Sequence, residues 1–376
     1  MPVRGCLNLN RFLAITIRIM IENKHKDRIL FADILRVFTI FAIIVFHITT
    51  NRWFTSFQEN PAEWHTINIF VACLRWCVPV FFMLSGMIFL DPTYNTTIKK
   101  LYTKTIPRIL CALIFWSVAY RLLSPLVASF LDIKPITGDD FHRIYEEIFL
   151  GTPWHHLWFM YPLLAMYMLT PLLRIFTANA KKEHYIYFLI LYFIFGSVIP
   201  TIDARFQVHI SFNISELFSY TGYFIAGYFF YKFDLTKREK IVLYTLGIAS
   251  FVGTYAVSTI VGLTNGGPAT QFFDRTGPNT MLSAFFIFVF VKDLVNNSPK
   301  LLKYTNNKYI TTLANCGLGV YLVHDFFNII LNMLNINTGT FPAILSVPVL
   351  SILVYMASLG VVLIIKKIPV LNKWII

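Results

Sequence analysis

One apolar stretch of the sequence carries side chains that can bind an anion and accept a proton. It reads RILFADILRVFTIFAIIVFHITT and contains Asp33, Arg36 and His47. At 3.6 residues per turn, the eleven residues from Arg36 to His47 make close to three full turns, so a helix places both side chains on one face, roughly 16 Å apart along its axis. A neutral imidazole accepts protons near neutral pH, and a guanidinium donates to anions. We predict that His47, Arg36 and Asp33 are catalytic, with Asp33 pairing with Arg36.

Other polar and aromatic residues occur in or beside further apolar stretches, several of them near the same end as His47. We select seven as candidate substrate-binding residues: Arg75, His156, Trp158, Tyr161, Arg275, His324 and Asp325. Taken singly, each is more often an interface residue. For Asp33, Arg36 and His47 the alternative is that they serve only as anchors at the two ends of a helix. Ionisable groups inside a membrane are costly, however, so their common depth favours a bundle that gathers them around His47.

The composition indicates a protein whose solvent is lipid. Of the 376 residues, 56% are hydrophobic, 17% aromatic and only 14% charged, and the mean hydropathy is +0.62. Soluble domains carry about 25% charged residues. These values exclude a cytosolic enzyme, a disordered chain and a disulfide scaffold. The five cysteines are scattered, and the close pair Cys73 and Cys77 has no adjacent further ligand, so we expect structural cysteines and no metal.

Apolar stretches of roughly 17–25 residues predict an all-α integral membrane protein, a bundle of about ten transmembrane helices. The ten predicted spans are 29–49, 66–90, 107–130, 155–176, 185–200, 216–233, 241–263, 278–295, 311–334 and 342–365. Pro79, inside the second span, is expected to kink its helix. We predict that Ser85 and Gly86 allow a neighbouring helix to approach closely.

The basic residues predict the orientation of the chain. Of the 32 Lys and Arg, 24 lie in alternate connections and at both termini, and five lie in the remaining connections. The positive-inside rule therefore places both termini in the cytoplasm. The net charge of +13 is explained by this topology and by anionic lipid, without a nucleic-acid partner.

The same topology divides the chain into three parts. We expect a basic cytoplasmic N-terminal segment at 1–28, a transmembrane domain at 29–365 and a cytoplasmic tail at 366–376. Met1 and Met20 are both plausible starts. The longest outer connection, 131–154, is acidic, and we expect a short helix there over the outer mouth.

Four sequence motifs, in this order, resemble the membrane acyltransferase 3 family: ADILR…FHITT, VPVFFMLSG, HLWFMYPLLAMYMLTPLL and GLGVYLVHDFF. The resemblance runs from about Arg28 to the C-terminus. The family's mark is an Arg or Lys followed, after ten residues, by a His in the first span, and here these are Arg36 and His47. The resemblance implies that this pair is essential, with acyl-CoA as the donor from the cytoplasm and a sugar hydroxyl as the acceptor.

Many members also carry an Arg-x-x-Arg before the third span. This chain has Lys99, Lys100, Lys104 and Arg108 there, which keep the positive charge but not that spacing. We expect the CoA nucleotide to be held by Lys99, Lys104 and Arg108, because basic side chains suit phosphate.

The resulting hypothesis is a membrane O-acyltransferase in which His47 is the general base. The arm of acetyl-CoA would pass Arg36 to reach His47, by direct transfer or through an acetyl-His intermediate. Trp158 and Tyr161 would stack against a sugar, with His156, Arg275 or Asp325 binding hydroxyls.

The acceptor would be a cell-surface glycan or a lipid-linked saccharide. We expect a multi-pass protein of the bacterial cytoplasmic membrane in contact with lipid. The sequence does not indicate its oligomeric state. The alternative function is a transporter or flippase, which composition and topology fit equally well.

Overall fold

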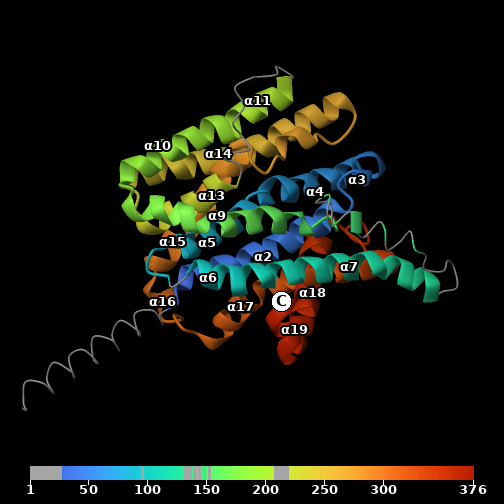
Figure 1. The fold of residues 1–376 in the computed structure, drawn as a ribbon. Coiled ribbons are helices and arrows are strands. Elements are labelled where there is room, and N and C mark those ends of the chain that lie inside the picture. Colours follow the sequence, from blue (N-terminus) through green and yellow to red (C-terminus); the bar gives the residue numbers. More distant parts are fainter. Residues whose placement is uncertain are drawn as a thin grey trace, which may run out of the picture.

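The structure is a computed structural model that describes residues 28–94, 97–130, 154–206 and 220–376, with isolated positions between 138 and 150. Within these residues every regular element is a helix (Figure 1). The basic segment at 1–27 and most of the acidic connection at 131–154 lie outside the described residues, so the expectations for them stay predictions.

Nine helical segments of the described chain are long and apolar enough to cross a membrane. They are Leu30–Thr50, Pro61–Phe89, Ile98–Leu123, Leu157–Asn179, Lys182–Phe206, Lys237–Asn265, Pro278–Asn296, Lys308–Met333 and Ala343–Ile365. Each overlaps one predicted span, which confirms the prediction of an all-α, multi-pass membrane protein. The fifth runs well beyond its predicted bounds of 185–200, because α10 (Lys182–Phe193) continues through a π-helical turn, Ile194–Val198, into α11 (Ile199–Phe206).

The remaining predicted span, 216–233, corresponds to the shorter helix α13 (Thr221–Lys232). Twelve residues rise only about 18 Å, less than the ~30 Å hydrocarbon core of a bilayer. Its residues 221–230 are all buried within the protein. This helix is therefore part of the core of the bundle, and residues 216–219 before it are outside the described part.

The second span is broken into α4 (Pro61–Leu74) and α5 (Cys77–Phe89). The break comes from Pro79, whose ring excludes the carbonyl group four residues earlier and whose nitrogen has no hydrogen to donate to it. That carbonyl belongs to Arg75, so the predicted kink appears as an interruption at Arg75. The helical hydrogen bonding resumes with the amide of Val80 and the carbonyl of Trp76, at 3.0 Å.

Helix α2 (Leu30–Thr50) lies in the middle of the bundle. It packs against α4, α5, α15 (Pro278–Asn296), α17 (Lys308–Met333) and α18 (Ala343–Ile365). Its core contacts bury Leu35, Ile40 and Ile44. The helix that carries the predicted catalytic pair is thus surrounded by other helices.

Helices α5 and α13 pack backbone to backbone. A Cβ atom added to Gly86 would lie 1.8 Å from the carbonyl oxygen of Phe224, and one added to Gly227 would lie 1.9 Å from that of Met83. Only glycine permits this approach, as expected for small residues between membrane helices. The predicted role of Gly86 is confirmed, and this contact holds the short helix α13 against the broken span.

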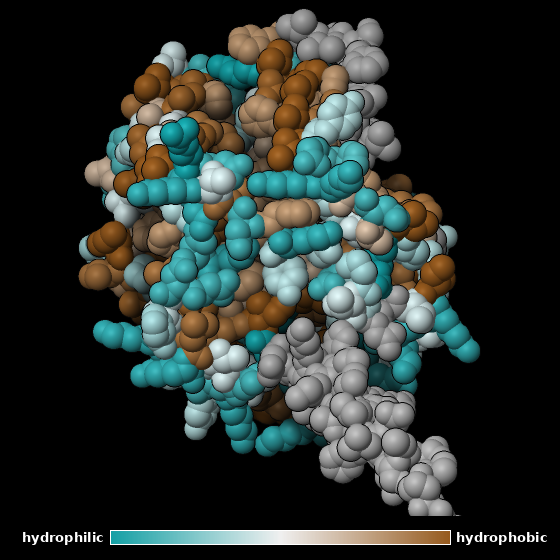
Figure 2. All heavy atoms as spheres, turned by 90° about the vertical axis from the view of Figure 1, so that its left-hand side faces the viewer, coloured by the Kyte–Doolittle hydropathy of each residue, from teal (hydrophilic) through white to brown (hydrophobic). Residues whose placement is uncertain are grey.

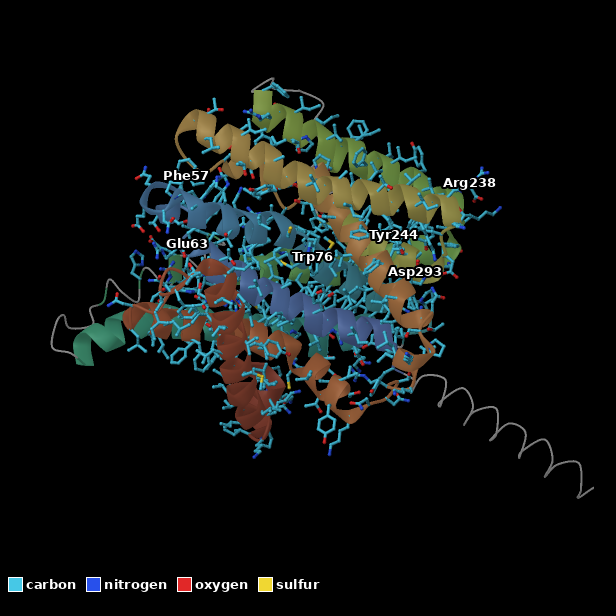
Figure 3. All side chains as sticks on the ribbon, turned by 180° about the vertical axis from the view of Figure 1, so that it is seen from behind. Phe57, Glu63, Trp76, Arg238, Tyr244 and Asp293 are labelled. Atoms are coloured by element: carbon cyan, nitrogen blue, oxygen red, sulfur yellow. The ribbon has the colours of Figure 1, made fainter. Side chains whose placement is uncertain are left out.

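The labelled residues distinguish the two ends of the bundle. Figure 3 shows Arg238, at the start of α14 (Lys237–Asn265), at one end and Phe57 and Glu63 at the other. Polar side chains cover the face at the Arg238 end (Figure 2). Near this end, Lys292 donates to Asp234 at 2.8 Å, and its charge holds the pKa of that carboxyl below its usual value.

The segment predicted as a tail, 366–376, folds back onto the bundle. It forms α19 (Pro369–Trp374), which packs on α7 (Ile106–Phe130). The indole of Trp116 donates to the carbonyl of Ile375 at 2.8 Å, and Ile375 is buried. It is therefore packed structure and not a free tail.

Candidate active site

Arg36 and His47 both belong to α2, an uninterrupted helix of 21 residues. The continuous helix that is required to place both side chains on one face is therefore present. His47 lies in the last turn, toward the end of the bundle that carries Phe57 and Glu63. Arg36 lies near the opposite end.

Asp33 pairs more closely with Arg28 than with Arg36. Arg28 donates to both carboxylate oxygens, at 2.6 and 2.7 Å, whereas the guanidinium of Arg36 lies 3.5 Å away. Arg28 also donates to Asn315 of α17 at 3.1 Å. The predicted pair with Arg36 is present, but Asp33 mainly fastens the start of α2 to α17. Asp33 lies fourteen residues before His47 on the same helix. It is therefore a positioning residue in this structure and does not belong to the site around His47.

Arg36 and Arg108 act on a common neighbour that the sequence does not single out. Tyr167, in the middle of α9 (Met160–Asn179), interacts electrostatically with both guanidinium groups. One arginine comes from α2 and the other from α7. The charges of two arginines, one from each helix, therefore act on one buried phenol.

The three residues expected to hold the nucleotide have different environments. Lys99, in the short helix α6 (Ile98–Lys100), and Lys104, in the π-helical turn Leu101–Thr105, are exposed. Arg108 instead donates its Nε to the carbonyl of Ile376 at 3.0 Å. Arg108 is exposed as well, but part of its guanidinium is already used by the folded-back segment.

Four histidines converge at the end of the bundle that is predicted to face outward. The ring centroid of His47 lies 5.1 Å from that of His324, 5.5 Å from that of His155 and 6.3 Å from that of His156. They come from α2, from α17 and from the turn before α9. We call these four residues the histidine cluster. The predicted gathering of polar residues around His47 is therefore present, and it includes His155, the neighbour of His156, which was not among the selected candidates.

Asp325 is the acidic partner of the cluster. Its side chain is buried, and it accepts hydrogen bonds from Asn328, at 3.1 Å, and from the indole of Trp154. His155 Nε2 lies 3.4 Å from one carboxylate oxygen and His156 Nδ1 lies 3.9 Å from the other. The carboxylate is thus fixed by two donors and faces two histidines.

The hydrogen bonding of His324 determines which of its nitrogens carries the proton. Its Nδ1 contacts the backbone carbonyl oxygen of Tyr321. Because a carbonyl oxygen only accepts, Nδ1 must be the donor, and Nε2 of the neutral ring then holds a lone pair. That Nε2 is buried and has no hydrogen-bond partner among the described residues. Buried polar atoms normally have partners, so this one is suited to accept from a bound molecule.

A cavity of about 230 Å³ opens beside the cluster. Its polar lining includes His47, His155, Arg75, Arg275 and the indole of Trp158. It is smaller than the ~300–1,000 Å³ of drug-sized sites, which suits a small part of a larger ligand. Arg36 is not among its lining residues, so a route that joins Arg36 to this cavity stays a prediction.

Two arginines beside this cavity make cation–π contacts with aromatic rings. The guanidinium of Arg275 lies 3.6 Å from the centre of the Trp158 ring, and that of Arg75 lies 4.8 Å from that of Phe46. The predicted sugar-stacking surface of Trp158 is therefore covered by Arg275 on one face. Both arginines border the cavity and provide donors there.

Tyr161 does not belong to this lining. Its hydroxyl donates to the carbonyl of Ile148 at 2.7 Å. The predicted stacking role of Tyr161 is therefore not supported, because this side chain fastens α9 to the outer connection.

The fold and the site define a multi-pass membrane protein with a buried histidine cluster near one surface. The sequence profile of the acyltransferase 3 family, described as an acyltransferase domain, matches residues 29–367. Since the match covers most of the chain, the protein belongs to this family of membrane acyltransferases. No curated protein and no solved structure matched the chain.

Proposed function

We propose that the protein transfers an acetyl group from cytoplasmic acetyl-CoA to a hydroxyl of a cell-surface or lipid-linked glycan. The observation that carries the proposal is the position of His47, which borders the outer cavity while its own helix carries Arg36 toward the cytoplasm. The motifs also resemble those of the bacterial O-acetyltransferase that acts on enterobacterial common antigen. We therefore favour the bacterial cytoplasmic membrane as its location.

The proposed reaction needs one base and donors for the developing oxyanion. His47 takes the proton of the acceptor hydroxyl while the hydroxyl oxygen forms a bond to the thioester carbonyl carbon. The carbon–sulfur bond then breaks, and the CoA thiolate recovers the proton from the His47 imidazolium. The guanidinium groups of Arg75 and Arg275, which border the same cavity, supply donors for the oxyanion.

The donor enters from the other end in this proposal. Lys99 and Lys104 are exposed cations that suit the nucleotide phosphates. Arg36 and Arg108, around Tyr167, continue the positive charge into the bundle. The pantetheine arm then has about three helical turns to cover, roughly 16 Å, between Arg36 and His47.

The test is transfer of labelled acetyl from acetyl-CoA to extracted glycans by the purified protein in lipid nanodiscs. We expect a base-labile ester product, and His47→Ala should lower kcat by at least about 10²-fold, the usual contribution of a positioned base. The matched control is His65→Ala, a half-buried histidine of α4 outside the cluster. Wild-type activity in His47→Ala protein of normal abundance would exclude His47 as the base.

A further inference from the structure

The outer end of the bundle holds three ligand-type side chains arranged as in a metal site. The nearest nitrogen or oxygen atoms of His155, His156 and Asp325 all lie within 4.8 Å of one another. Two of the separations are 3.4 Å, for His155 Nε2, and 3.9 Å, for His156 Nδ1, each measured to a carboxylate oxygen of Asp325. Two imidazoles and one carboxylate are a ligand set of catalytic zinc sites.

These separations suit a tetrahedral ion. Zinc lies about 2.0–2.2 Å from nitrogen and oxygen ligands, so its ligand atoms are about 3.4 Å apart. His155 Nε2 already lies at this separation from one oxygen of Asp325, and His156 Nδ1 lies 0.5 Å further than that from the other oxygen. The side chain of His155 is 54% exposed and is therefore free to adjust.

The carboxylate of Asp325 is oriented by hydrogen-bond donors, as carboxylates that bind metals usually are. Asn328 donates to one oxygen of Asp325 and Trp154 to the other. Such outer partners orient a ligand and prevent it from turning away. They leave the side of the carboxylate that faces the two histidines available.

His156 provides an independent observation. Its side chain is completely buried, and neither Nδ1 nor Nε2 has a hydrogen-bond partner among the described residues. At 3.9 Å, the approach of Nδ1 to Asp325 is too long for a hydrogen bond. Burying an imidazole without partners is unfavourable, and a metal ion between Nδ1 and the carboxylate removes that penalty.

We propose that His155, His156 and Asp325 bind a divalent transition-metal ion, with zinc the expected metal. Of the three residues, His155 borders the cavity, so in this proposal a further ligand of the ion would come from the cavity. Arg75 and Arg275 make that cavity positive, so binding depends strongly on the negative charge of Asp325. An acceptor hydroxyl bound to the ion would become more acidic beside His47; only this last role rests on the proposed function.

The experiment measures metal without any substrate. The full chain, carried on a tag that contains no histidine, is purified in detergent, stripped with a chelator, incubated with Zn²⁺ and desalted. Metal per chain is then determined by mass spectrometry. We expect about one Zn²⁺ per chain, and Co²⁺ in its place should give the visible absorption bands of a tetrahedral site.

Three variants remove one ligand each: His155→Ala, His156→Ala and Asp325→Asn. Each should raise the Kd for the metal by at least about 100-fold, more than the loss of an outer-shell partner does. His142→Ala is the matched control, because it removes an exposed histidine away from the trio. Since His155 is itself exposed, its variant should fold even if the buried variants do not accumulate.

Less than about a tenth of an ion per chain in the wild type, or equal metal content in wild type and His155→Ala, would overturn the proposal. Metal bound by a protein that fails to transfer acetyl would leave the site standing and refute the proposed function. Acetyl transfer by a protein that binds no metal would support the proposed function and refute the metal site.

Discussion

At the scale of single residues, the sequence predicts which groups are chemically able to act but not how each is held. His47, His156, His324 and Asp325 were all accessible to prediction, because ionisable groups within apolar stretches are conspicuous. The contacts that decide their roles were not. The proton position in His324 depends on a backbone carbonyl of its own helix, and Trp154 reaches Asp325 from 171 residues away.

The first prediction at this scale concerns the free nitrogen of His324. In His324→Gln, an amide oxygen replaces Nε2 as an acceptor, whereas in His324→Asn the amide reproduces only the Nδ1 donor. If the Nε2 lone pair contributes to the reaction, His324→Asn should lower kcat by about 10²-fold and His324→Gln should retain clearly more activity. Equal kcat values for the two variants, at equal abundance, would show that this lone pair is not used.

The second prediction separates donor binding from acceptor binding. Arg36→Ala removes a positive charge from the inner half of the bundle, so the KM for acetyl-CoA should rise about tenfold or more, as expected for one lost charged contact of 1.5 kcal/mol or above. The KM for the glycan should change little. Arg36→Lys keeps the charge and serves as the control. An equal rise of both KM values would contradict a donor-specific role for Arg36.

At the scale of helices, apolar runs and proline predict the elements well, and exceptions arise where helices contact each other. The spans were predictable because lipid requires long apolar helices. Residues 221–230 of α13 carry an apolar pattern as well, yet they are enclosed by protein. Periodicity does not distinguish a helix that faces lipid from one that is buried, and the two glycine contacts with α5 become visible only in the packing.

The third prediction tests that packing by comparing glycines in different surroundings. Gly227→Ala places a methyl group against the backbone of Met83, where there is no room. The free energy of unfolding should therefore fall by about 3 kcal/mol, the upper end of the cost of an overpacked core. Gly253→Ala, in α14, has open space around its Cβ. It should be neutral or stabilising by up to ~1 kcal/mol, because alanine favours helices. Thermal unfolding in detergent measures both, and equal effects would refute close packing of α5 on α13.

At the scale of the whole molecule, the charge pattern predicts the orientation of the chain, and the proposed function places the donor entrance and the acceptor entrance at opposite ends of it. The described structure agrees in its layout, since Lys99 and Lys104 belong to one end and the histidine cluster to the other. What the sequence could not indicate is the folding of 366–376 onto α7, because that segment is short and becomes recognisable only through its contacts with Trp116 and Arg108. Two-sidedness is also the property on which the proposed transfer across the membrane depends.

The fourth prediction tests this orientation in intact cells with one cysteine at each end. In a background without native cysteines, Glu63→Cys should react with a membrane-impermeant maleimide, because Glu63 lies at the predicted outer end. Arg238→Cys lies at the opposite end (Figure 3) and should react only after the membrane is permeabilised. The two variants control for each other, since each replaces a charged residue near the end of a helix. Labelling of Arg238→Cys in intact cells would show that the orientation is the opposite of the predicted one. Cytoplasmic acetyl-CoA would then have no access to the end that carries Lys99 and Lys104.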